Sequence, residues 1–165
     1  MAVRRLNHAV LYVKDLARSV AFYREALGLE VRAEMSGSAA FLRAPDSAND
    51  HDLGLFAVPQ GRLPAGPYLG LYHLAWEVGT LAELAEVRAR LAALGALVGQ
   101  SDHRVSKSLY ARDPSGIEFE VMWRVPADHW EREMATGPMI APLDLDAEIE
   151  RWGEQVTGAA AGSIT

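Results

Sequence analysis

The strongest constraint on the fold is an internal repeat. Five residues of one segment recur with the same spacing in a second segment: Leu6, His8, Val13, Leu16 and Ala17 return as Leu71, His73, Val78, Leu81 and Ala82. A repeat of this kind indicates two copies of one supersecondary unit. A single histidine in an apolar strand usually has a structural role. The recurrence of this one at the same point of both copies favours a shared function instead.

The first copy has the pattern of a strand, a helix and three further strands. We expect a strand over 6–13, followed by a helix over 16–27 whose apolar residues recur at helical spacing. Asp15 is placed to cap this helix and Gly28 to end it. Three short segments follow, "EVRAEM", "AAFLRA" and "DLGLFAV", each with the length of a strand. This copy therefore predicts a β-α-β-β-β unit.

The second copy has the same order of elements. A strand over 71–78 precedes a helix over 81–94, and Thr80 and Glu83 have the spacing of a capping box. Gly95 ends the helix, and three more strand segments follow. Two such units predict an α+β fold, in which the paired modules form a cupped mixed β-sheet with the helices on its convex face.

Four segments follow one another along the chain: a first module over 1–57, a linker over 58–70, a second module over 71–125 and a C-terminal tail over 126–165. The linker is rich in proline and glycine. The tail breaks the repeat, and we expect one short helix near 146–152 and a disordered end, "TGAAAGSIT". The two modules are expected to make one domain.

Composition excludes several classes of function. The net charge of −6 disfavours nucleic acids and anionic membranes as partners. The chain has no cysteine, which excludes disulfides, zinc fingers and a thiol nucleophile. No apolar run reaches the roughly 18 residues of a membrane span, and the N-terminus does not have the pattern of a signal peptide. We therefore expect a cytoplasmic protein.

The last strand of the second module has two different faces. Its apolar face, suited to lie under a helix, consists of Ile117, Phe119, Val121 and Trp123. The opposite face carries Glu118 and Glu120. A carboxylate without a partner on a buried face is costly. A bound metal ion would supply the compensating charge.

The repeated histidine completes a candidate metal site. If the modules pack with pseudo-twofold symmetry, His8 and His73 approach a shared concave face, where Glu118 or Glu120 joins them. Two histidines and one carboxylate suit ferrous iron and leave positions for substrate and oxygen, although zinc or manganese fits the same set. The equivalent segment of the first module, "DLGLFAV", offers no fourth ligand. The site is therefore expected to be open, as in catalytic metal centres.

Residues 4–125 resemble the vicinal oxygen chelate superfamily, whose paired β-α-β-β-β modules surround a divalent metal. The segment "DPSGIEFEVMW" matches the superfamily pattern D-P-x-G-x-x-x-E, in which the glutamate four residues after the glycine is a ligand. The resemblance therefore selects Glu120 over Glu118. It implies His8, His73 and Glu120 as the metal ligands.

Within the superfamily, the chain is most similar to type I extradiol dioxygenases of the small, one-domain kind. The similarity lies in "YHLAWEV", "SDHRVSKSLYARDPSG" and "GIEFEVMW". It implies catalytic roles for His103 and Tyr110, as an acid/base and a hydrogen-bonding group. It also implies Fe(II) as the metal, with Mn(II) or another divalent ion as alternatives. The expected reaction is cleavage of a catechol-type aromatic diol with O2.

The resemblance leaves other activities open. An epoxide-opening thiol transferase shares the ligand set, whereas a glyoxalase-like isomerase needs a fourth ligand, and a metal-free antibiotic-sequestering protein generally lacks the ligands. His103 and Tyr110 favour ring cleavage. The sequence does not identify the diol. It also leaves open whether His51 or the tail, which contains His129, contributes to the site.

A homodimer is also expected. Cupped sheets of this superfamily commonly associate in pairs. The tail carries apolar residues that need a partner or a groove: Trp130, Met139, Ile140 and Trp152.

Overall fold

The computed structural model describes residues 3, 5–63 and 69–159. The chain forms two compact units. The first consists of the residues up to Leu69 together with the turn Asp113–Ile117, and the second consists of Gly70–Arg112 and the residues from Glu118 onward. None of the helices within the described ranges is both long and apolar enough to cross a membrane.

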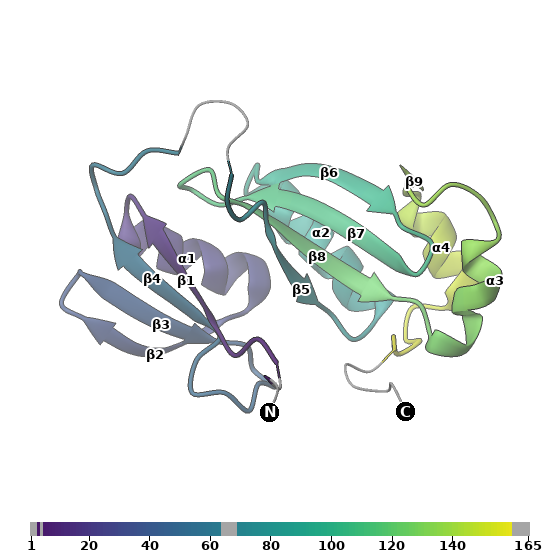
Figure 1. Ribbon diagram of the computed structural model, residues 1–165, viewed down its shortest axis with the longest axis horizontal. Coiled ribbons are helices and arrows are strands. Elements are labelled where there is room, and N and C mark those ends of the chain that lie inside the picture. The colour runs from purple at the N-terminus through teal and green to yellow at the C-terminus, as the bar shows by residue number, and fades with distance from the viewer. Residues whose placement is uncertain (1–2, 4, 64–68, 160–165) are drawn as a thin grey trace. The chain divides into compact units, whose positions relative to one another are not determined.

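The first unit is a four-stranded sheet with one helix. Its elements are β1 Ala9–Val13, α1 Leu16–Leu27, β2 Glu30–Met35, β3 Ala39–Arg43 and β4 Leu53–Ala57. The strand order is β1-β4-β3-β2, with β1 parallel to β4 and the other pairs antiparallel. Figure 1 shows α1 lying along this sheet, and it contacts β3 and β4.

The second unit repeats this arrangement and adds to it. Its elements are β5 Leu74–Glu77, α2 Leu81–Ala93, β6 Leu97–Asp102, β7 Ser106–Arg112, β8 Glu118–Arg124, the 3-10 helix η1 Ala127–His129, α3 Trp130–Met134, β9 Ala141–Pro142 and α4 Leu145–Trp152. The strand order is β5-β8-β7-β6-β9, and β5 pairs with β8 in parallel. Helix α2 contacts β6 and β8.

The predicted α+β class and the two β-α-β-β-β modules are confirmed. The first helix has the predicted bounds, and the second ends one residue earlier, at Ala93. The first strand of each module is shorter than predicted, because β1 begins at Ala9 and β5 at Leu74. His8 and His73 therefore lie immediately before a strand, at equivalent points of the two modules. The last strand begins at Glu118, so Ile117 lies in the preceding turn.

The capping residues act as expected from the sequence. Asp15 accepts a hydrogen bond from the Arg18 backbone nitrogen, and Gly28 ends α1 with a φ of 70°. Thr80 and Glu83 form a reciprocal capping box at the start of α2. These local interactions explain why the helix starts could be located without tertiary information.

Each unit has its core between its sheet and its helix. The first core is centred on Val13, Tyr23, Ala26, Leu42, Leu53 and Leu55, and the second on Leu81, Leu84, Leu91, Leu109, Phe119, Val121 and Trp123. The alternation predicted for β8 is therefore confirmed for Phe119, Val121 and Trp123. Burial of these apolar side chains is the main driving force for each unit.

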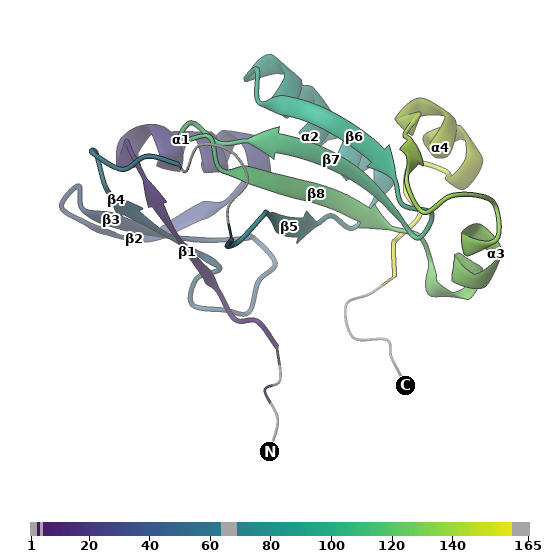
Figure 2. The same ribbon diagram turned by 45° about the horizontal axis from the view of Figure 1, so that its top comes forward.

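The tail is more ordered than the sequence indicated. Only a helix near 146–152 was expected, and α4 corresponds to it, but η1, α3 and β9 are additional. Figures 1 and 2 show α3 and α4 grouped at the same end of the second sheet as β9. These elements are too short for a hydrophobic period to reveal them, and they depend on contacts with the sheet. Most of the tail end, "TGAAAGSIT", lies outside the described residues.

Candidate metal centre

His73 and Glu120 face each other in the second unit. His73 precedes β5, and the next residues pair in parallel with β8, so that Ala75 lies opposite Glu120. This register brings His73 Nε2 to 3.1 Å from Glu120 Oε2. The Glu120 side chain is buried, and that of His73 is partly exposed. Two ligand atoms that each lie about 2.1 Å from one ion, at about 90°, are about 3.0 Å apart. The pair therefore fits a divalent ion.

The two glutamates of β8 have different partners. Glu118 pairs with Arg112 at 3.3 Å and accepts a hydrogen bond from Tyr72. In the described part of the chain, the only ion-pair partner of Glu120 is His73. Glu118 is thus paired with an arginine, whereas the ion-pair partner of Glu120 is a histidine. The choice of Glu120 as a metal ligand stays a prediction.

His103 and Tyr110 form a hydrogen-bonded pair beside Glu120. The His103 Nε2 atom lies 2.8 Å from the Tyr110 hydroxyl oxygen. Tyr110 is the direct register partner of Glu120 in the antiparallel pair β7–β8, so their side chains leave the sheet on the same face. The Tyr110 ring is 5.8 Å from that of His73, centre to centre. The second unit therefore brings together His73, Glu120, Tyr110 and His103.

The electrostatic environment keeps Tyr110 protonated. Burial, followed by the negative charge of Glu120, raises the pKa of the Tyr110 hydroxyl. A neutral hydroxyl is a hydrogen-bond donor at neutral pH. Tyr110 can therefore donate to His103 or to an oxygen atom of a bound molecule.

His8 lies in the first unit, and its nearest aromatic neighbour there is His51. Their ring centres are 4.6 Å apart, and His8 Nδ1 lies 2.9 Å from Asn7 Oδ1. His51 Nδ1 in turn lies 2.9 Å from Asp50 Oδ2. Neither unit, taken alone, holds among its described residues a group of three His, Asp or Glu side chains that could bind a metal. The predicted three-ligand set consists of one residue from the first unit and two from the second.

Sequence reasoning did not identify how His51 comes to lie beside His8. The loop before β4 is folded around Asn49, whose amide nitrogen donates to the Asn7 carbonyl and to Asp52 Oδ1. Asp52 also accepts from the Ala44 backbone nitrogen and the Ser47 hydroxyl. Of these bonds, the one from Asn49 to Asn7 joins residues far apart in sequence, and the parallel β1–β4 register brings the same two segments together.

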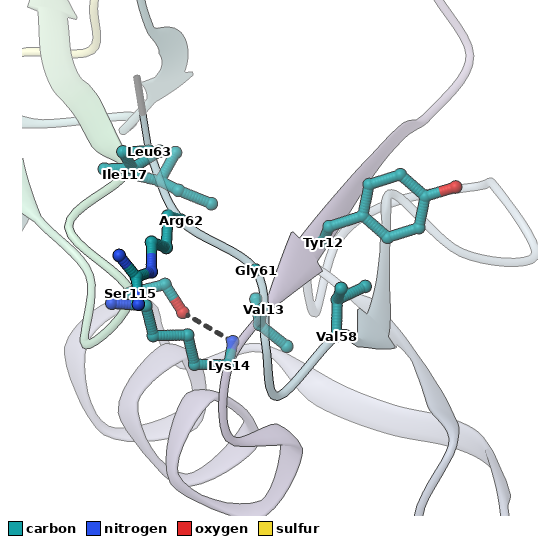
Figure 3. Close-up of a pocket in the computed structure, with 9 residues that line it drawn as sticks. All are labelled: Tyr12, Val13, Lys14, Val58, Gly61, Arg62, Leu63, Ser115 and Ile117. Carbon is teal, nitrogen blue, oxygen red and sulfur yellow. Dashed lines mark hydrogen bonds between the residues drawn. The ribbon is translucent and has the colours of Figure 1, made fainter. Parts of the chain in front are cut away.

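The first unit also contains a cavity of about 450 Å³ at the end of β1 (Figure 3). It is lined by Tyr12, Val13, Lys14, Val58, Gly61, Arg62, Leu63, Ser115 and Ile117. Figure 3 shows Lys14, Arg62 and Ser115 on one side, with Tyr12 on the other. The Lys14 backbone nitrogen donates to the Ser115 hydroxyl at 3.1 Å, which ties the turn before β8 to the start of α1.

The sequence profile of the Glyoxalase/Bleomycin resistance protein/Dioxygenase superfamily matches residues 5–121, and the chain belongs to this superfamily. It is 28% identical over 156 residues to the catechol-2,3-dioxygenase of Bacillus subtilis (strain 168). This match covers 91% of the chain and 53% of that enzyme, so the chain spans about half the length of this relative.

Two further relatives have other activities in their names. Metallothiol transferase FosB of Lysinibacillus sphaericus (strain C3-41) is 28% identical over 124 residues, which are 73% of this chain and 82% of that protein. The crystal structure of lactoylglutathione lyase from Agrobacterium tumefaciens superposes with a TM-score of 0.56 at 27% identity. That match covers 74% of this chain and 95% of the lyase. The similarity thus defines the superfamily and a shared fold, and it leaves the reaction open.

Proposed function

We propose that this protein is a metal-dependent extradiol dioxygenase that opens the ring of a catechol-type diol with O2. The observation that carries the proposal is the joint placement of two pairs. The His73–Glu120 pair has a spacing that fits a divalent ion, and the His103–Tyr110 pair lies directly beside it. The name of the Bacillus subtilis relative supports the same activity.

In this proposal, His8, His73 and Glu120 hold the metal. Fe(II) is the ion best suited to O2 chemistry on such a ligand set, and Mn(II) suits the same ligands. When bound, the ion would bring the diol and O2 together and supply the electron transfer between them. Both oxygen atoms of O2 then enter the product, a ring-opened semialdehyde.

The protein residues supply proton transfer and orientation. His103 Nε2 accepts a proton from a diol hydroxyl and later returns it, since an imidazole changes its charge near neutral pH. Tyr110, held neutral by burial and by Glu120, donates a hydrogen bond to a reacting oxygen atom. The Nε2 atom and the Tyr110 hydroxyl lie 2.8 Å apart, so the two groups are side by side for these roles.

The test is reconstitution of the full chain with Fe(II) under anaerobic conditions, followed by addition of catechols and air. The proposal expects a yellow ring-fission product and incorporation of both atoms of labelled O2. Glu120→Gln should abolish the activity, and the matched variant Glu118→Gln should retain most of it. O2 consumption without ring opening in the wild-type protein would contradict the proposal.

A thiol transferase is the second candidate. The FosB relative, which is named a metallothiol transferase, is 28% identical over 124 residues, the same identity as the dioxygenase relative. Incubation of the Mn(II)-loaded protein with a thiol and an epoxide tests this activity directly. Thiol addition without any catechol cleavage would favour the transferase over the dioxygenase.

A further inference from the structure

We propose that the C-terminal segment, residues 126–159, positions His103 through the side chain of Arg104. This inference rests on the proposed function, in which His103 transfers protons. It assigns a positioning role to Arg104 and a catalytic purpose to a segment outside the two repeated modules.

The turn between β6 and β7 is unusually tight. The Val105 backbone nitrogen donates to the His103 carbonyl at 2.8 Å, and the His103 backbone nitrogen donates to the Ser106 carbonyl at 2.9 Å. Arg104, between them, has a φ of 68°, in the left-handed region that glycine adopts most easily. A non-glycine residue in this conformation is strained, and such strain persists only where surrounding contacts maintain it.

The contacts that maintain it come from the C-terminal segment and from Asp102 of β6. Arg104 Nε donates to the Pro138 carbonyl oxygen at 2.8 Å, and Arg104 Nη1 lies 3.3 Å from Asp102 Oδ2. The Arg104 backbone nitrogen donates to the other oxygen of Asp102 at 2.7 Å. A Cβ atom on Gly137 would lie only 3.1 Å from the guanidinium, so the segment fits closely around Arg104.

Asp102 is held in turn by a buried charge cluster. Lys107 is fully buried, and its Nζ atom lies 2.6 Å from Asp102 Oδ1 and 3.3 Å from Glu148 Oε2 of α4. Glu148 also accepts from Trp152 Nε1 and lies near Arg151, which pairs with the buried Glu133 of α3. The segment thus supplies charged partners from two helices.

The backbone of the segment reinforces this connection. Ala141 of β9 is the register partner of Asp102, the residue immediately before His103. Gln100 Nε2 also donates to the Leu143 carbonyl at 2.7 Å. The His103 backbone is therefore held by the segment on one side, and its ring is held by the Tyr110 hydroxyl on the other. His103 can act as a proton acceptor at a defined position only if both its backbone and its ring are held.

The substitution Arg104→Gly tests the positioning of His103 without preventing the turn from folding. Glycine suits a φ of 68°, so the turn itself should form at least as well. The side-chain bonds to Pro138 and Asp102 are lost, while the backbone bond to Asp102 can remain. The matched control is Arg88→Ala. Arg88 pairs with Asp146 of α4 at 2.6 Å, so this substitution removes a different contact to the C-terminal segment. This control leaves all contacts of the His103 turn in place.

The main readout does not depend on activity. Full-length protein with nitrogen-15-labelled histidine is loaded with Zn(II), and the imidazole resonances are assigned with His103→Phe. The wild-type His103 ring should show one tautomer, as its bond to Tyr110 requires. In Arg104→Gly its two nitrogen shifts should approach the averaged values of a free imidazole, with Zn(II) content unchanged. Arg88→Ala should match the wild type. Unchanged His103 shifts in Arg104→Gly would overturn the inference.

The catalytic readout is made separately with the Fe(II)-loaded protein. For any catechol that the wild type cleaves, Arg104→Gly should lower kcat by about 10-fold to 100-fold and leave KM nearly unchanged. A wild-type kcat in this variant would also overturn the inference. If the wild type cleaves no catechol but the His103 shifts change as expected, the dioxygenase proposal fails and the positioning of His103 by the segment stands.

Discussion

Glu118 and Glu120 leave β8 on the same face but have different partners, Arg112 for the first and His73 for the second. This difference predicts different effects of removing either charge. Glu120→Gln should weaken binding of Fe(II) or Mn(II) by at least about 100-fold, while Glu118→Gln should bind within a few-fold of the wild type. Calorimetric titration with Mn(II) measures both. Equal losses in the two variants would show that Glu120 is not a ligand.

His103→Phe should retain the metal and lose turnover. The imidazole is outside the predicted ligand set, so the variant should still bind stoichiometric Fe(II) and a catechol. Loss of an acid/base group typically lowers turnover by about 10²–10⁴-fold. Metal analysis and the initial rate of ring opening test this. A variant with wild-type turnover would transfer the acid/base role to Tyr110, His51 or a water molecule.

The two lysines of the chain lie in opposite environments and should respond differently to removal. Lys107 is fully buried between two carboxylates, so Lys107→Ala leaves uncompensated buried charge. Such a change typically lowers the free energy of unfolding by about 3–5 kcal/mol. Lys14 has an exposed side chain, and Lys14→Ala should change the free energy of unfolding by no more than about 0.5 kcal/mol. Urea denaturation gives both values.

Low pH should weaken the buried charge cluster that contains Asp102 and Lys107, and so lower the free energy of unfolding. Burial opposes ionisation of Asp102, but the hydrogen bonds from Lys107 and the Arg104 backbone outweigh it, and the pKa of Asp102 is lowered. A carboxyl group whose folded pKa is lowered stabilises the fold above its unfolded pKa of about 3.9 and loses this effect as pH falls through the folded value. The free energy of unfolding should therefore drop more steeply below about pH 4 than in Asp102→Asn, which cannot titrate. Parallel curves would contradict this.

The homodimer remains a proposal, and fewer apolar residues of the tail are exposed to form its interface than the sequence suggested. Trp130 donates to the Val125 carbonyl, and the Trp152 ring packs 5.9 Å from that of Trp123, so both are used inside the second unit. Met139 and Ile140 are each 67% exposed. Light scattering at micromolar concentration should show a dimer, and Met139→Ser with Ile140→Ser should give a monomer. A monomeric wild type would refute the proposal.

Local signals in the sequence were sufficient for the repeated modules. Asp15, Gly28 and the Thr80–Glu83 pair act within a few residues of their own helix, so their positions could be read directly. The Glu120 choice rested on a local turn pattern. By contrast, the contact between Lys107 and Glu148 and the contact between His8 and His51 form only through tertiary packing. No periodicity encodes such long-range pairs, which is why the charge cluster and the histidine pair were not predicted.

The two-residue strand β9 also has a consequence for self-association of the sheets. Without it, β6 would present a row of free backbone donors and acceptors, which is a template for another chain. The partner that covers Ser101 is Pro142, which has no N–H group and cannot extend the ladder further. In the first unit, the outer strand β2 carries alternating charges and a bulge between Val31 and Ala33. The sheet edges at β2 and at β6 are thus blocked by different means, and loss of the C-terminal segment would leave β6 open to pairing with another chain.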